Sequence, residues 1–294
     1  MPKSVPLPRL TLSAAALALT ACSTTAPESV GPPARETIFG VSASNQLVRF
    51  NAGQPQKLLE RRRLTGLHAG ERLLGLDYRV AKGQLYALGR SGQLYRIDTA
   101  TARALPVGAP VALPPQGTAY GVDFNPTVDR LRVVNDAGHN LRLHPDTGAV
   151  IDGNTDQPGL QFDGRLAYDA ADIAAGKTPR IVAAGYTYNK DNEKITTNFA
   201  LDGEAGTLVR QGSAEGTVPL VSPNTGRLYT VGSLGLGRFT DASLDISDVS
   251  NAAYAGIGDA GATRWYRIDL KTGRADFVGT IGGGEALVGT AIEP

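Results

Sequence analysis

The sequence predicts an all-β protein, folded as a β-propeller of about six four-stranded blades, with five blades as the alternative count. Three observations lead to this expectation. A unit of four short strand patterns recurs along the chain, its clear copies start about 45 residues apart, and the two ends of the domain are complementary parts of one unit. A β-sandwich or a β-helix is the alternative architecture, and the repeat length and the complementary ends disfavour both.

The clearest copy of the unit runs through residues 76–79, 83–88, 92–98 and 102–108. Each piece has four to seven residues of alternating or apolar β-formers and is bounded by Gly, Asn, Asp or Thr. The 36 glycines and 18 prolines of the chain fit many short strands joined by tight turns. This copy therefore defines a four-stranded blade.

Other copies follow it along the chain. A second spans residues 121–150 and a third spans 244–279, and both keep the order of four strands. Weaker copies start near Leu166 and Pro219, and the one at Pro219 is truncated. Counting the truncated unit as a blade gives six blades, which we favour, and merging it with its neighbour gives five.

The ends of the domain predict how the ring closes. Residues 285–292 read as a first strand with no hairpin after it, while residues 38–42, 45–50 and 56–59 read as second, third and fourth strands with no first. A C-terminal strand that pairs into the N-terminal blade removes two exposed sheet edges. We therefore expect one propeller domain over residues 37–294.

The N-terminus predicts export and a lipid anchor. Lys3 and Arg9 precede an apolar run over residues 10–19 that is too short to span a bilayer, as in a signal peptide over residues 1–21. The next residue is Cys22, the one cysteine of the chain, and residues 19–22 (LTAC) resemble the bacterial lipobox, in which the thiol carries diacylglycerol.

By resemblance to sorted lipoproteins, Ser23 after the cysteine implies the outer membrane, facing the periplasm. Residues 22–36 are rich in Ser, Thr, Pro and Gly and predict a flexible tether. The membrane is then the expected partner, through the anchor. A net charge of +1 argues against nucleic acid, because binding to phosphates needs a concentrated basic face.

Acidic residues recur in the predicted first strands. Asp77, Asp123 and Asp245 hold the same place in three copies, with Asn125 and Asp169 nearby. First strands line the channel of a propeller, so these side chains are candidates for binding a ligand or a hard cation such as calcium. The alternative, which we favour, is that each Asp accepts hydrogen bonds from backbone donors at a strand end.

A second candidate for calcium lies in one loop. Asp152, Asn154, Asp156 and Asp163 match the first, third, fifth and twelfth positions of a calcium-binding loop. The sixth position is Gln157, where such loops have glycine for a sharp turn. We therefore favour a polar turn.

Motifs for catalysis are missing from the sequence. It contains no H-E-x-x-H, G-x-S-x-G or C-x-x-C. Tyrosines recur within the units, and we expect them to pack blade against blade: Tyr86, Tyr95, Tyr229, Tyr254 and Tyr266. The sequence thus favours a non-catalytic binding or scaffold module whose partner is a protein or glycan of the cell envelope. A metal-dependent hydrolase or lactonase with a cation in the channel is the alternative.

The repeated motifs also resemble a known family. Residues 76–79 with 83–86, residues 122–126 with 129–134, and residues 183–187 resemble the bacterial domain of unknown function 4394. The similarity extends over residues 38–292. It implies a propeller-like fold in secreted or anchored proteins, and it brings no assigned catalytic residues.

Overall fold

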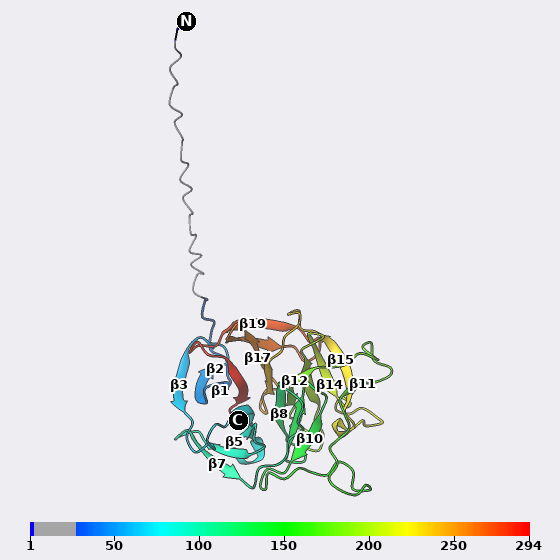
Figure 1. The fold of residues 1–294 in the computed structure, drawn as a ribbon. Helices are drawn as coiled ribbons and strands as arrows, with labels where there is room; N and C mark the ends of the chain where they lie inside the picture. Colours follow the sequence, from blue (N-terminus) through cyan, green and yellow to red (C-terminus); the bar gives the residue numbers. More distant parts are fainter. Residues whose placement is uncertain (3–27) are drawn as a thin grey trace.

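The strands of this protein form five small sheets arranged around one axis (Figure 1). The computed structural model describes residues 1–2 and 28–294. Apart from Met1 and Pro2, the predicted signal peptide lies outside the described residues, as does Cys22. In the part that is described, no helix has both the length and the apolar character needed to cross a membrane.

Each sheet is one blade, and we number the blades 1 to 5 in chain order. Blade 1, from the axis outward, consists of β20 (Leu287–Ile292), β1 (Thr37–Ser42), β2 (Gln46–Asn51) and β3 (Leu58–Arg63). Blade 2 consists of β4 (Leu73–Arg79), β5 (Gln84–Gly89), β6 (Leu94–Asp98) and β7 (Arg103–Val107), with the 3₁₀ turn η1 (Val80–Lys82) after β4.

The remaining blades follow the same plan with local changes. Blade 3 consists of β8 (Tyr120–Asn125), β9 (Arg130–Asn135) and β10 (Asn140–Leu143). Blade 4 consists of β12 (Ile181–Tyr186), β13 (Asn198–Asp202), β14 (Thr207–Gln211), β15 (Arg227–Ser233) and the edge strand β11 (Ala167–Tyr168), with the 3₁₀ turn η2 (Pro223–Thr225) before β15. Blade 5 consists of β16 (Ala242–Ile246), β17 (Ala253–Asp259), β18 (Ala262–Ile268) and β19 (Ala275–Thr280).

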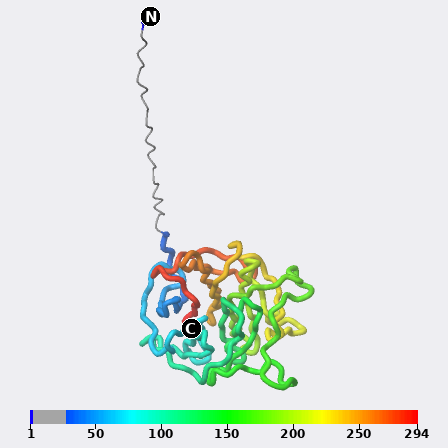
Figure 2. The backbone as a smooth tube through the Cα atoms, in the orientation of Figure 1, coloured from blue at the N-terminus to red at the C-terminus, as the bar shows by residue number. Residues whose placement is uncertain are grey.

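The predicted propeller and its mode of closure are confirmed. The last strand, β20, pairs antiparallel with β1 and supplies the innermost strand of blade 1. The backbone tube shows this directly, because the red C-terminal strand lies beside the blue N-terminal strands (Figure 2). The innermost strands then contact one another in a closed ring: β20, β4, β8, β12 and β16.

The number of blades is five, so the count of six is wrong and the alternative is right. The two weaker copies belong to one blade. The pattern near Leu166 forms only the two-residue strand β11, which lies at the outer edge of blade 4 and runs parallel to β15. The innermost strand of this blade is β12, and the truncated unit after Pro219 supplies its fourth strand, β15.

Five clusters of buried apolar side chains, one at each seam between neighbouring blades, hold the ring together. Four of the five recurrent tyrosines lie in these clusters as expected, and Tyr229 instead donates to Asp169 within blade 4. Tyr86 packs edge-on against Phe124 across the seam of blades 2 and 3. Tyr254 stacks on Trp265, which packs against Phe50 of blade 1. The seam of blades 3 and 4 has seven buried apolar residues, the fewest of the five, while the seam of blades 4 and 5 has fifteen.

The axis of this five-bladed ring is narrow. A methyl group added at Gly121 would lie 2.6 Å from backbone atoms of Ala183 and Ala184, and one at Gly289 would lie 2.9 Å from the Cα of Gly75. Such distances are shorter than contacts of real side chains, so the innermost strands can approach this closely only where glycine stands. The axis is therefore packed with backbone at this level.

Residues 28–36, which the sequence assigns to a flexible tether, instead lie against the propeller. The Glu28 carboxylate accepts hydrogen bonds from the backbone N–H and the hydroxyl of Thr280, at 2.7 and 2.6 Å. The Asn51 side chain bonds both the N–H and the carbonyl of Ala34 at 2.8 Å. The N-terminal segment thus follows the seam of blades 5 and 1.

Candidate functional site: a carboxylate cluster and a groove

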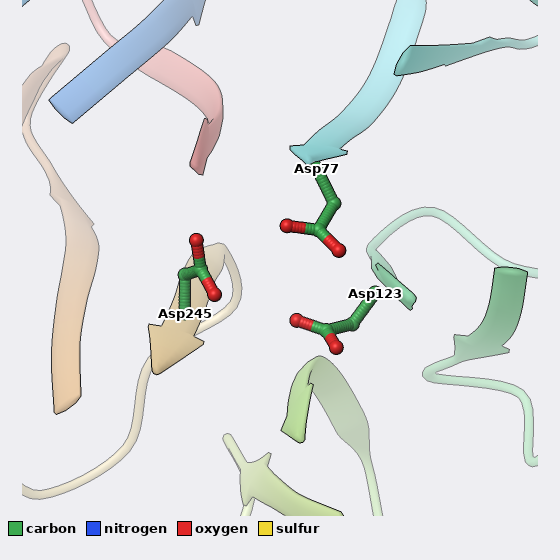
Figure 3. Close-up of side chains that lie close together, drawn as sticks. All are labelled: Asp77, Asp123 and Asp245. Atoms are coloured by element: carbon green, nitrogen blue, oxygen red, sulfur yellow. The ribbon is translucent and has the colours of Figure 1, made fainter. Parts of the chain in front are cut away.

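Three aspartates meet at one end of the axis, as Figure 3 shows. Asp77 comes from β4, Asp123 from β8 and Asp245 from β16, and one carboxylate oxygen of each lies within 4.8 Å of the others. The three residues are 5%, 3% and 6% exposed. Within residues 28–294 they are the one group of at least three His, Cys, Asp or Glu side chains this close together.

The position of each Asp follows from the strand pattern. Each Asp precedes a large side chain near the end of an innermost strand. Neighbouring innermost strands lie close enough for the Asp side chain of one to bond the backbone of the next. The two remaining inner strands carry Gly185 and Ala291 at the equivalent place, immediately before Tyr186 and Ile292. The ring therefore holds three carboxylates at five equivalent positions.

Each Asp accepts a hydrogen bond from the backbone of the next blade. Oδ2 of Asp77 accepts from the N–H of Phe124 at 2.6 Å. Oδ1 of Asp123 accepts from Tyr186 at 3.1 Å, and Oδ2 of Asp245 accepts from Ile292 at 2.5 Å. These bonds satisfy buried backbone donors, in agreement with the interpretation favoured from the sequence.

Burial raises the pKa values of all three groups, and the nearby carboxylates of the cluster add to this for Asp77 and Asp123. Burial, reinforced by the charge of Asp245, raises the pKa of Asp77 well above its ordinary value. Burial, reinforced by the charge of Asp77, does the same to the pKa of Asp123. Burial raises the pKa of Asp245 to about 7. The low-dielectric surroundings thus favour neutral acids over three adjacent negative charges.

The cluster matches a calcium site only in part. A cavity of about 20 Å³ lies between these carboxylates, enough for one water or one small ion. Carboxylate oxygens are the correct ligand type, but calcium takes about six to eight oxygens, and one oxygen of each Asp already accepts from a backbone N–H. The geometry suits carboxyl groups that join neighbouring blades by accepting hydrogen bonds from backbone N–H groups.

The other two predicted members of the cluster lie elsewhere. Asn125 accepts a hydrogen bond from the N–H of Thr127 and shapes the turn after β8. Asp169, which the sequence places near the three aspartates, instead follows the edge strand β11, where its carboxylate accepts hydrogen bonds from Tyr229 and Arg227. A short strand at the outer edge of a blade has the same local sequence character as one at the axis.

The predicted calcium loop is a polar turn. Oδ1 of Asp152 accepts from the N–H of Asn154 at 3.0 Å, and Oδ1 of Asn154 accepts from the N–H of Asp156 at 3.2 Å. Asp163 is buried away from these side chains in an ion pair with Arg142 and Arg132. The four predicted ligands are therefore not brought to one cation, because arginines occupy the carboxylate at the twelfth position.

A groove at the seam of blades 3 and 4 is the larger candidate site, with a volume of about 470 Å³. Loops after β8, β10, β12 and β14 form its walls. Its lining combines basic and aliphatic side chains, chief among them Val128, Arg130, Arg142, Lys194, Ile195 and Leu220. Two of the aliphatic residues are well exposed, Val128 at 53% and Leu220 at 72%.

A buried polar network lies beneath the groove. Asp163 receives two bonds of 2.8 Å from Arg142 and one of 3.1 Å from Arg132. Arg132 also donates to the hydroxyl of Tyr186 and to the side chain of Asn224, both at 2.6 Å. Two guanidinium groups share one carboxylate, so the network leaves a net positive charge beside the groove.

Two further cations of the groove have no acidic partner. Arg130 donates only to the backbone carbonyls of Val128 and Asp129, and among the described residues neither it nor Lys194 lies within 4.0 Å of a carboxylate. Glu215, the acidic residue that lines the groove, already accepts from Thr187 and Asn189. The groove therefore keeps unpaired positive charge beside exposed aliphatic surface.

Of the predicted ligand-binding residues only Asn125 lines this groove, and sequence reasoning did not predict the groove itself. The signal that was available is Arg132, a charged residue at a buried place in β9, with Arg130 and Arg142 half-buried nearby. A buried arginine requires acceptors and a counter-charge. The partners, Asp163 and Asn224, lie in loops far along the chain, and strand patterns do not predict where such loops fold.

Comparisons with known proteins agree with the fold. The sequence profile of a family described as "Domain of unknown function (DUF4394)" matches residues 46–291. A search of curated proteins finds no match. Among solved structures, the chain is similar to one of a nidogen/laminin complex, with a TM-score of 0.50 and 10% identity over 88% of this chain and 98% of that chain. At this identity the likeness shows the fold alone.

Two structures from Bacteroides thetaiotaomicron are more distant. One is an auxiliary nutrient binding protein, with a TM-score of 0.40 and 16% identity over 75% of this chain and 56% of that chain. The other is a structural genomics protein of unknown function, with a TM-score of 0.47 and 13% identity over 81% of this chain and 56% of that chain.

Proposed function

This chain belongs to the family described as "Domain of unknown function (DUF4394)", and from that premise we propose that it is a non-catalytic binding module that holds a ligand in the groove between blades 3 and 4. The observation that carries the proposal is the groove itself. Its volume of about 470 Å³ falls in the range of ligand sites. Exposed aliphatic side chains and unpaired cations together line it, as in sites that recognise a ligand.

Buried polar bonds tie together the structure beneath the groove. Arg132 is buried in the network with Asp163 and Asn224, which fixes the loop walls to two blades at once. Fixed walls lower the entropic cost of binding, because few groups need to be ordered when the ligand arrives. Binding loops on a rigid scaffold are the common arrangement for recognition by propellers.

We place this binding module at the cell envelope. The resemblance of residues 19–22 to a lipobox supports lipidation of Cys22, and Ser23, by resemblance to sorted lipoproteins, supports retention at the outer membrane facing the periplasm. Six residue steps separate Cys22 from Glu28, which is bound to Thr280, and an extended chain spans at most about 3.5 Å per residue. The seam of blades 5 and 1 would then stay within about 20 Å of the membrane.

This placement leaves the groove accessible. In Figure 1 the N-terminal segment leaves the ring beside β3 and β19, whereas β10 and β15 lie across the ring from it. The groove walls belong to the blades of β10 and β15. A ligand could therefore reach the groove from the side of the protein that faces away from the anchor.

The proposal is tested with two matched variants in a ligand-observed NMR screen of small molecules and short peptides. Leu220→Glu places a charge in the groove, and Val218→Glu places one on the same loop at a residue that does not line it. Both positions are highly exposed, so the fold tolerates either change. Compounds that bind the wild type and Val218→Glu but not Leu220→Glu support the proposal, and a screen without such compounds contradicts it.

A further inference from the structure

We infer that the ligand of the groove is a small anionic amphiphile, a carboxylate or phosphate group joined to a short aliphatic chain. This inference rests on the proposed binding function and adds the chemical class of the ligand. It follows from the positive charge of the groove, from its free hydrogen-bond donors, and from the apolar surface beside these donors.

The charge of the groove favours an anion. Four cations contribute to its lining, Arg130, Arg132, Arg142 and Lys194, and the carboxylates near them are Asp163 and Glu215. Asp163 is shared by two guanidinium groups, and Glu215 keeps its negative charge because its bonding partners are neutral, so four cations face two carboxylates and the balance is positive. A ligand with a negative group would supply the counter-charge that the cations of the groove lack.

Donors remain for that anion. In Arg142, Nε and Nη2 bond Asp163, and Nη1 has no partner among the described residues. Arg130 bonds carbonyls through Nη1 alone, which leaves Nη2. Guanidinium and ammonium groups form short, charge-assisted bonds with carboxylate and phosphate oxygens. The groove is thus equipped to hold an oxyanion without rearranging its buried network.

The aliphatic part of the lining favours a ligand with an apolar portion. Val128, Ile151, Ile195 and Leu220 line the groove together with the cations. Binding becomes more favourable in proportion to the apolar surface that a ligand removes from water. An inorganic anion would leave this surface in water, and a neutral hydrocarbon would leave the cations without a counter-charge, so one molecule with both parts fits best.

The test is isothermal titration calorimetry of the full chain with four probes: decanoate, monodecyl phosphate, decyltrimethylammonium and acetate. We expect saturable binding of one or both of the anionic decyl compounds, with binding of the cationic and short probes at least about tenfold weaker, a difference of about 1.4 kcal/mol. All measurements are made below the concentration at which the probes form micelles. Equal binding of decyltrimethylammonium, or no binding of either anion, overturns the inference.

Matched charge variants locate the site. Lys194→Gln removes a cation that lines the groove, and Lys190→Gln removes one from the same loop outside it. We expect Lys194→Gln combined with Arg130→Gln to weaken the anionic probe at least about tenfold, and Lys190→Gln to leave it unchanged. Equal affinity in all variants would place the anion elsewhere and contradict the inference.

The failure of this inference differs from the failure of the proposed function. If the NMR screen finds neutral or cationic compounds whose binding is lost in Leu220→Glu, the binding function stands and the ligand class is wrong. If no compound of any charge depends on Leu220, both are wrong.

Discussion

The carboxylate of Asp123 accepts a hydrogen bond from the backbone N–H of Tyr186, 3.1 Å away, across the seam of blades 3 and 4. Asp77 and Asp245 make the same bond to the next blade. These bonds join neighbouring inner strands directly, and they place three carboxyl groups together at the axis. The same side chains therefore hold the ring closed and repel one another when ionised.

The first prediction concerns pH. An Asp has a pKa of about 3.9 in an unfolded chain, whereas burial raises the pKa of Asp245 to about 7 in the folded protein. The folded state thus binds protons that the unfolded state has released. The contribution of Asp245 to the free energy of unfolding is therefore fully present below about pH 4 and is lost as the pH rises through about 7.

Asp123→Asn tests the same effect at a second member of the cluster, whose pKa burial also raises, because the amide oxygen can still accept from Tyr186 and carries no charge. We expect the variant to exceed the wild type in free energy of unfolding by roughly 1 to 3 kcal/mol at about pH 8, and to lose that advantage at about pH 4. Urea denaturation at both pH values measures it. The lowered pKa of His139 acts in the opposite direction but equally in both proteins. A variant less stable than the wild type at the higher pH would contradict the account.

The second prediction concerns calcium. Since each Asp of the cluster already accepts from a backbone N–H, we expect millimolar calcium to shift the midpoint of thermal unfolding by less than about 1 °C, because an ion stabilises only a state that binds it. Differential scanning fluorimetry with calcium and with a chelator measures this shift. A large rise that the chelator reverses, and that Asp123→Asn abolishes, would instead establish a cation site.

The third prediction concerns the network beneath the groove. Asp163→Asn removes the carboxylate that two buried guanidinium groups share. An uncompensated buried charge is costly, so we expect the free energy of unfolding to fall by about 3 kcal/mol. Asp156→Asn, a change at an exposed residue of the same loop, serves as control in urea denaturation. Equal stability of the two variants would mean that the network contributes little.

The fourth prediction concerns the narrow axis. A methyl group at Gly121 would meet backbone atoms at 2.6 Å, so the strands of blades 3 and 4 would have to separate. We expect Gly121→Ala to lower the free energy of unfolding by at least about 2 kcal/mol. Gly31→Ala is the control, because its nearest contact would be 3.4 Å away. Thermal unfolding of the two variants measures the difference. A Gly121→Ala variant as stable as Gly31→Ala would show that the innermost strands of blades 3 and 4 can accommodate a methyl group.

Much of the fold could be predicted from the sequence, because strands and turns are local features. The closing strand β20 was identified from the residues that the N-terminal blade lacks. The number of blades was harder to predict. The sequence of β11 resembles that of an innermost strand, but β11 lies at the outer edge of blade 4 because it pairs with β15. Pairing between distant segments is decided by packing and leaves no local pattern.

One of the two candidate sites could be predicted from the sequence and the other could not. The recurrence of Asp77, Asp123 and Asp245 at one place in the repeat was enough to predict that they meet. The groove was not predicted, because its walls come from four loops whose positions depend on the contacts of Asp163 and Asn224 with Arg132. Sites built on repeated strands are visible in a sequence, and sites built from loops between them are not.

The most direct test of the binding function is native mass spectrometry of the full chain, purified in a mild detergent from cells that produce it. The wild type and Val218→Glu are expected to retain a small bound molecule in addition to any lipid anchor, and Leu220→Glu, with a charge in the groove, is expected to lack it. The same bound mass in all three proteins, or none in the wild type, would contradict a ligand in the groove.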